Sequence, residues 1–195
     1  LNLALYFATS FATSYGTNYI AAYTIAINLW FFAAFAVDGY ASAGNILSGK
    51  FLGAKEFETL VQLSQKLTKK ALIVGISMAS IGGIFYNSLG EVFTSDPIVL
   101  SIFNEAFWIV LLMQPLCALT FVFDGIFKGL GQMRVLRNVL LTSTLLVFIP
   151  ALFLGDSLNL KLHGILWAFT IWIVARGLPL FVKFRKQFLP LTRKH

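Results

Sequence analysis

The sequence predicts an all-α, polytopic membrane protein, and three observations support this. Of its 195 residues, 58% are hydrophobic and 12% are charged, whereas a soluble domain carries about 25% charged residues. Six segments are apolar over a length close to the ~20 residues that a helix needs to cross a bilayer. Basic residues gather in every second connection between these segments. A globule of this size cannot bury so many apolar side chains, so we expect lipid to surround most of them.

The six predicted spans differ in how clearly their ends are marked. They cover about residues 1–16, 20–47, 71–89, 97–130, 139–154 and 163–182. The first is short, and we expect it to be truncated on its N-terminal side. The fourth begins at Pro97, a favourable residue for the first turn of a helix. Pro115 inside the fourth span removes one backbone hydrogen bond, which predicts a kink.

The charges between the spans predict the topology. Five Lys or Arg residues follow the second span, three follow the fourth and five follow the sixth. They are Lys50, Lys55, Lys66, Lys69, Lys70, Lys128, Arg134, Arg137, Lys183, Arg185, Lys186, Arg193 and Lys194. The opposite connections hold only Lys161. Because basic loops stay cytosolic, we expect a multi-pass protein of the cell inner (plasma) membrane with a cytosolic C-terminus. The net charge of +7 is then a signal of topology, and nucleic acid is excluded as a partner.

Two further segments are expected at the cytosolic surface. Residues 54–70 are polar with spaced apolar positions, a pattern typical of an amphipathic helix lying in the membrane interface. Residues 188–195 are expected to form a basic cytosolic tail in contact with lipid headgroups. Residues 1–187 would then form one transmembrane lobe, embedded in the bilayer.

Four charged residues lie inside the predicted spans, where a charge costs at least ~2.5 kcal/mol at the bilayer centre. Asp38 stands twelve residues before Lys50, or ~18 Å along a helix, so we expect it near the middle of the hydrocarbon. Asp124 lies near the end of the fourth span, and Glu105 lies two turns after its start, where we expect an outer interfacial position. Arg176 lies inside the sixth span. These residues are candidates for binding a coupling cation or a substrate.

Each candidate also has a structural alternative. Asp38 could hydrogen-bond to a neighbouring helix. Asp124 stands four residues before Lys128 and could pair with it along one helix. Arg176 could neutralise either aspartate, or it could extend to the cytosolic interface, which we favour. Tyr40 could line an aromatic substrate path, although helix packing is the stronger expectation.

The sequence contains no pattern of catalytic or metal chemistry. His163 and His195 do not stand in metal-ligand spacing with Cys or acidic residues. No nucleophile elbow, Walker loop or dinucleotide-binding glycine motif occurs. We therefore expect no enzyme activity, no catalytic or metal-binding residues and no cofactor.

Three segments share a pattern with a known family. They are residues 21–39, with AAYTIAINLW running into VDG, residues 44–55, with SGKFLGAK, and residues 121–132, FVFDGIFKGLGQ. In order and spacing they resemble the C-terminal lobe of a MATE (multidrug and toxic compound extrusion) transporter, closest to the DinF-like branch. The resemblance implies that the chain forms helices seven to twelve of a twelve-helix transporter, whose N-terminal lobe lies outside this sequence.

The resemblance also implies a function. Transporters of this family exchange protons or Na⁺ for organic, often cationic, small molecules by alternating access. Asp124 matches the acidic residue of the family's tenth helix that is linked to cation coupling, while residues 1–16 contain no acid. Two alternatives remain at this point: a flippase for lipid-linked or polysaccharide cargo in the same superfamily, and an inactive fragment of a split gene.

Overall fold

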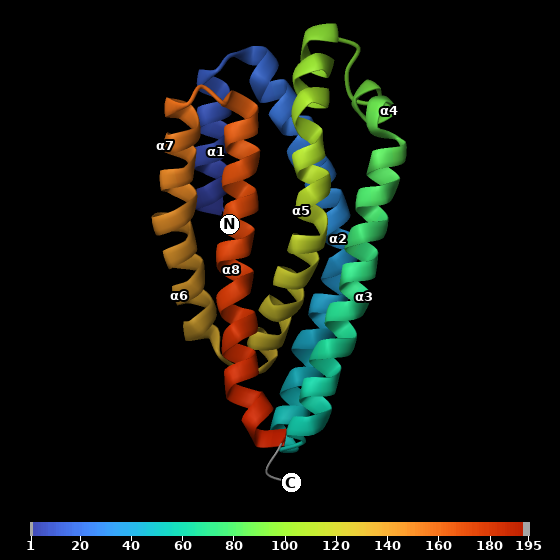
Figure 1. Ribbon diagram of the computed structural model, residues 1–195, viewed down its shortest axis with the longest axis vertical. Coiled ribbons are helices and arrows are strands. Elements are labelled where there is room, and N and C mark those ends of the chain that lie inside the picture. Colours follow the sequence, from blue (N-terminus) through green and yellow to red (C-terminus); the bar gives the residue numbers. More distant parts are fainter. Residues whose placement is uncertain (1, 193–195) are drawn as a thin grey trace.

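The computed structural model describes residues 2–192, and the chain folds there into a bundle of helices running up and down (Figure 1). In chain order the helices are α1 (Asn2–Ser14), α2 (Thr17–Gly53), α3 (Phe57–Ile84), α4 (Tyr86–Glu91), α5 (Pro97–Gly129), α6 (Met133–Ser143), η1 (Thr144–Phe148), α7 (Ile149–Ser157) and α8 (Lys161–Thr192). The α2–α3 and α5–α6 connections and the end of α8 lie toward the same end of the bundle (Figure 1). The described basic clusters therefore share one end, as the alternation of charges predicts.

Five helices of the described chain are long and apolar enough to cross a membrane. They are α2, α3, α5, the continuous segment Met133–Ser157 and α8. The first predicted span corresponds to α1, which has 13 residues. At 1.5 Å per residue this helix is ~20 Å long, against ~30 Å of hydrocarbon. Its buried residues, Ala4, Ala8 and Ala12, stand four apart and form one stripe against the bundle.

The segments predicted as an interfacial helix at 54–70 and a span at 71–89 have different bounds in the structure. The structure has one continuous helix, α3, followed by the short α4. The chain turns at Lys55, which has a positive φ of 59°, and nothing between Lys70 and Ala71 breaks the helix. Leu60, Ser64, Leu67 and Ala71 are all buried, and their spacing puts them on one helix face. That continuous buried face joins the polar and the apolar halves into one helix.

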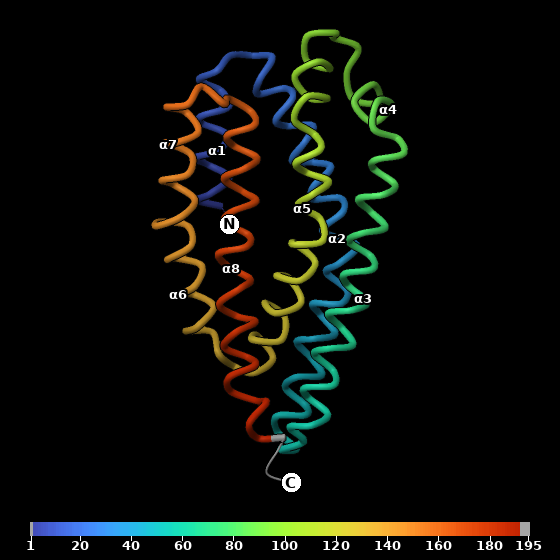
Figure 2. Tube along the Cα trace, viewed as in Figure 1, coloured from blue at the N-terminus to red at the C-terminus, as the bar shows by residue number. Residues whose placement is uncertain are grey.

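Two other predicted ends also differ from the structure. The span predicted at 139–154 begins at Met133 and runs as one continuous coil from α6 to α7 (Figure 2). It contains the π-helical turn η1. Pro150, which cannot donate to a carbonyl in the preceding turn, stands directly after this turn. The last helix was predicted over 163–182, but α8 runs to Thr192 and includes most of the tail predicted at 188–195. Residues 193–195 of that tail lie outside the described residues.

Helix α5 packs against α2, α3 and α8, and glycines bring the backbones together. A Cβ atom on Gly125 or Gly129 of α5 would lie 2.0 Å from the carbonyl oxygen of Ala41 or Asn45 on α2. On the other sides, a Cβ on Gly75 of α3 would lie 3.0 Å from a carbonyl of α5. Small residues at such contacts let membrane helices approach closely, where packing rather than burial from water drives association.

Tyrosines tie the α1–α2 connection to the α7–α8 connection. Tyr15 Oη donates to Asp156 Oδ1 at 2.8 Å, and Lys161 Nζ donates to Tyr19 Oη at 3.0 Å. Burial, together with the neighbouring Asp156 carboxylate, raises the pKa of Tyr15 well above the ordinary range of a tyrosine. Tyr15 therefore stays a protonated donor over the physiological pH range, and both ties hold the same end of the bundle.

The glycine contact between α5 and α2 makes a first prediction. Gly125→Ala places a methyl group against the Ala41 carbonyl, and overpacking of this kind costs about 1–3 kcal/mol. Thermal unfolding of the full-length protein in detergent should show a lower Tm. Gly39→Ala is the matched control, because a Cβ there meets no heavy atom within 4 Å. Equal Tm values for the two variants would contradict the packing argument.

Candidate functional site

A buried ion pair joins α5 to α8. Asp124 has 5% of its surface exposed, and its Oδ2 accepts a hydrogen bond from Arg176 Nη2. The helices are held together one turn away, where Gly177 of α8 lies directly on Thr120 of α5. Thr120 Oγ1 donates to the Ile173 carbonyl at 3.2 Å. This contact fixes the separation of the helices and so places the guanidinium on the carboxylate.

The ion pair corrects two expectations. Arg176 does not extend to the cytosolic interface, because the tertiary fold offers it a carboxylate at its own depth. Asp124 does not pair with Lys128: within residues 2–192, Arg176 is the only cation within ion-pair distance of it. The second oxygen of the carboxylate, Oδ1, is buried and has no hydrogen-bond partner in the described chain. The site therefore has one neutralised oxygen and one oxygen that could accept a proton or a cation.

A polar network extends from the ion pair to the π-helical turn. The Arg176 guanidinium lies 5.5 Å from the centre of the Trp172 ring, one turn earlier on α8, a cation–π arrangement. Trp172 Nε1 donates to Thr144 Oγ1 at 3.1 Å, and Thr144 begins η1. Through Trp172 the ion pair between α5 and α8 is thus connected to η1, the π-helical turn between α6 and α7. Such π-helical turns are frequent at functional sites.

Trp172 and Thr144 are not among the candidates that the sequence predicts. The four-residue spacing from Trp172 to Arg176, which places both on one helix face, was a usable signal. No pattern marked Thr144, because a single threonine in an apolar helix is common and the π-helical turn has no sequence signature.

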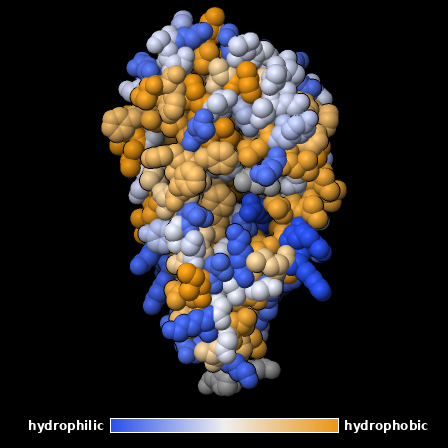
Figure 3. All heavy atoms as spheres, turned by 180° about the vertical axis from the view of Figure 1, so that it is seen from behind, coloured by the Kyte–Doolittle hydropathy of each residue, from blue (hydrophilic) through white to orange (hydrophobic). Residues whose placement is uncertain are grey.

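The second candidate acid, Asp38, lies in a groove of about 740 Å³ on α2. The lining residues are mostly aromatic or small: Asn28, Trp30, Phe31, Phe32, Ala34, Phe35, Asp38 and Phe121. Asp38 is exposed, and within the part of the chain that the structure describes it is the one charged residue of this lining. Seen from the side opposite to Figure 1, hydrophilic side chains gather at mid-height and below, under a mainly hydrophobic upper part (Figure 3).

The groove and the ion pair lie next to each other in the fold. Phe121 of α5 lines the groove and stands three residues before Asp124, which places them one helical turn apart. Asp38 itself stands three residues before Ala41, the α2 residue that contacts Gly125. Asp38 does not contact Arg176. Asp38 and Asp124 are instead connected through the close contact between Ala41 of α2 and Gly125 of α5.

The other two candidates lie away from this arrangement. Glu105 is exposed on α5 and accepts a hydrogen bond from Ser101 Oγ at 3.4 Å. His163 contacts the backbone carbonyl of Glu105 at 3.0 Å and not its carboxylate. Tyr40 is partly buried and packs against the hydrophobic cluster that includes Val37, outside the groove. These placements favour an interfacial role for Glu105 and a packing role for Tyr40.

The sequence model of the MatE family matches residues 1–154. The chain belongs to the MatE family. It is 31% identical over 125 residues to Protein DETOXIFICATION 45, chloroplastic, of Arabidopsis thaliana, a match covering 64% of this chain and 22% of that protein. It is 27% identical over 157 residues to the Bacillus subtilis protein named "Probable multidrug resistance protein YoeA", which covers 78% of this chain and 34% of the relative.

Solved structures of MATE transporters share the fold. The bent form of the Vibrio cholerae MATE transporter VcmN matches with a TM-score of 0.85 at 24% identity, over 95% of this chain and 42% of that one. An outward-facing multidrug resistance MATE family transporter matches with a TM-score of 0.81 at 20% identity, over 98% of this chain and 44% of that one. This MatE chain therefore spans less than half the length of these relatives, and its fold is that of one half of a MATE transporter. The DinF-like branch stays a prediction.

The ion pair of this MatE protein makes a second prediction. Asp124→Asn or Arg176→Gln alone leaves a buried charge without its partner, which costs about 3–5 kcal/mol. The double variant removes both charges and should recover much of the lost stability. Thermal unfolding of the four full-length proteins gives the coupling energy directly. Additive losses in the double variant would mean that the two side chains do not interact in the membrane.

Proposed function

We propose that this chain is one lobe of a transporter that exports organic cations in exchange for protons or Na⁺ by alternating access. The observation that carries the proposal is an acidic, aromatic groove one helical turn from a buried carboxylate with one unpaired oxygen. Membership of the MatE family supports a transport role. The multidrug resistance and detoxification names of the relatives support export of foreign or toxic compounds.

The groove supports a cationic organic substrate. A carboxylate at Asp38 neutralises the charge of such a molecule, and Phe32, Phe35 and Phe121 offer ring faces and apolar surface beside it. Cations are attracted to aromatic faces by about 0.5–2 kcal/mol, more when water is excluded. This combination disfavours polysaccharide cargo, whose many hydroxyls would need hydrogen-bonding partners that a groove of phenylalanines cannot supply.

The ion pair supports coupling to a cation. Protonation of Asp124, or Na⁺ bound at its unpaired oxygen, would weaken the attraction that holds Arg176. The contact between α5 and α8 would then loosen, and the position of Phe121 in the groove would follow α5. A coupled ion can shift the equilibrium only if it binds the two states differently, and a carboxylate that is paired in one state and released in the other meets this condition.

The lobe architecture supports a transporter larger than this chain. Structural relatives are more than twice as long as the part that this chain matches. In our proposal a second six-helix lobe provides the opposite wall of the substrate path, and the Asp38 groove faces it. The proposal places the protein in the plasma membrane with a cytosolic C-terminus, and the basic residues between the spans support this orientation.

Substrate recognition is tested by dye efflux from proteoliposomes that contain the full-length protein. Asp38→Asn should raise the KM for a cationic dye such as ethidium roughly tenfold, because the groove loses its only charge. Efflux of a neutral substrate of similar size should change little. Glu105→Gln is the matched control, since it removes an exposed carboxylate outside the groove. Unchanged ethidium transport by the Asp38 variant, or translocation of a labelled lipid in place of the dye, would reject the assignment.

Coupling is tested with the same vesicles under an imposed proton or Na⁺ gradient. Asp124→Asn should abolish gradient-driven efflux while downhill dye movement persists, because the variant cannot exchange a cation at this position. Arg176→Gln should keep some gradient dependence, since the carboxylate is still present. If Asp124→Asn responds to both gradients like the unmodified protein, the coupling residue is elsewhere.

A further inference from the structure

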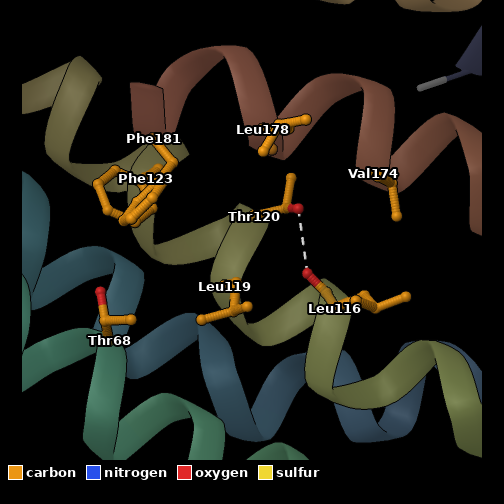
Figure 4. Close-up of a pocket in the computed structure, with 9 residues that line it drawn as sticks. Thr68, Leu116, Leu119, Thr120, Phe123, Val174, Leu178 and Phe181 are labelled. Atoms are coloured by element: carbon orange, nitrogen blue, oxygen red, sulfur yellow. Dashed lines mark hydrogen bonds between the residues drawn. The ribbon is translucent and has the colours of Figure 1, made fainter. Parts of the chain in front are cut away.

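A crevice of about 350 Å³ runs between α3, α5 and α8 and shares no residue with the Asp38 groove (Figure 4). Its walls are almost entirely apolar, formed mainly by Leu116, Leu119, Phe123, Val174, Leu178 and Phe181. In Figure 4, Thr68, Phe123 and Phe181 lie at one end of the crevice, and Leu116 and Val174 lie at the other. The transport proposal above does not use this space.

The Thr68 end continues into a second cavity of about 160 Å³. Thr68, Phe123 and Phe181 line both cavities, and the second adds the polar residues Gln65 and Arg185. The Arg185 guanidinium lies 5.5 Å from the centre of the Phe181 ring. Among residues 2–192, no carboxylate lies within ion-pair distance of Arg185. The cation is therefore available at the end of the bundle where the other basic residues gather.

The hydroxyl of Thr68 stands where the two cavities meet. Its Oγ1 is buried and has no hydrogen-bond partner in the described chain. A threonine inside a helix commonly donates to the carbonyl one turn earlier, and Thr170 on α8 does so. A buried hydroxyl without a partner costs free energy, so the position is suited to a polar atom of a ligand that enters the crevice.

We propose that these joined cavities bind one glycerophospholipid. Its phosphate would contact Arg185, its ester carbonyl groups would accept from Thr68, and an acyl chain would lie along α8 toward Val174. Val174 and Arg185 are separated by ~16 Å along α8. The cation, the hydroxyl and the apolar walls follow one another in the same order as the phosphate, the esters and the acyl chain of a phospholipid. Arginine suits phosphate because its planar guanidinium donates two parallel hydrogen bonds.

The exposure of the walls favours lipid over other occupants. Leu178 and Phe181 are 58% and 36% exposed on a helix long and apolar enough to span a membrane, so acyl chains have direct access. Among the described residues, the only charge that lines the two cavities is cationic, which disfavours the organic cations proposed for the Asp38 groove. Gly75 of α3 and Gly177 of α8 bring both helices close to α5. A lipid bound in the crevice would also hold α3 and α8 to each other.

The proposal is tested by photolabelling of the full-length protein. The protein is reconstituted in vesicles that contain a phosphatidylglycerol with a diazirine on its acyl chain, irradiated, and mapped by peptide mass spectrometry. Labels should concentrate on residues 116–123 and 174–181. Arg185→Gln should lower this labelling roughly tenfold, the effect expected from losing a charge-assisted contact. Lys183→Gln removes the same charge two residues away, outside both cavities, and should leave labelling unchanged.

A second variant tests the cavity itself. Leu119→Trp fills the crevice and should abolish labelling, whereas Leu112→Trp, seven residues earlier on α5 and outside both cavities, should not. Any one of three results would overturn the proposal. The crevice peptides could stay unlabelled because another part of the protein covers them, the four variants could label alike, or ethidium or a phosphate-free diacylglycerol could compete as well as unlabelled phosphatidylglycerol.

Discussion

The close approach of α5 to its neighbours is the constraint on which the rest of the lobe depends. Apolar side chains gain little when they leave lipid for an equally apolar bundle interior, so association rests on packing and on polar contacts between helices. Gly125 and Gly129 let α5 touch the backbone of α2, and Gly177 lets α8 reach Thr120. The contacts of Gly125 and Gly177 lie within a turn of Asp124, Asp38 or Arg176. The packing thus sets the positions of the polar groups.

A short stretch of α5 contributes to all three candidate sites. Leu119 and Phe123 line the crevice beside α8, Phe121 reaches the Asp38 groove, and Asp124 pairs with Arg176. A displacement of this stretch would change the groove, the ion pair and the crevice together. In the transport and lipid proposals, that shared helix would couple an ion, a substrate and a lipid, because one helix contributes residues to all three candidate sites.

Much of the fold could be predicted from the sequence, and the limits have identifiable causes. The start of α5 follows from Pro97, whose preference for the first turn of a helix is local. Polarity separated an interfacial part at 54–70 from a spanning part at 71–89, but the residue pattern did not show that one buried face runs through both parts of α3. The π-helical turn before Pro150 could not be located, since it has no signature in the residue pattern.

The sequence by itself determined that the chain is a multi-pass helical protein, which end of the bundle carries the basic residues, and that Asp38, Asp124 and Arg176 are the unusual charges. These follow from composition and from spacing along single helices. Only the tertiary structure decided that Arg176 pairs with Asp124, that Asp38 stands apart in an aromatic groove, and that Thr68 and Arg185 line the same second cavity. Such pairings depend on which faces meet between α2, α3, α5 and α8, and distance along the chain carries no information about them.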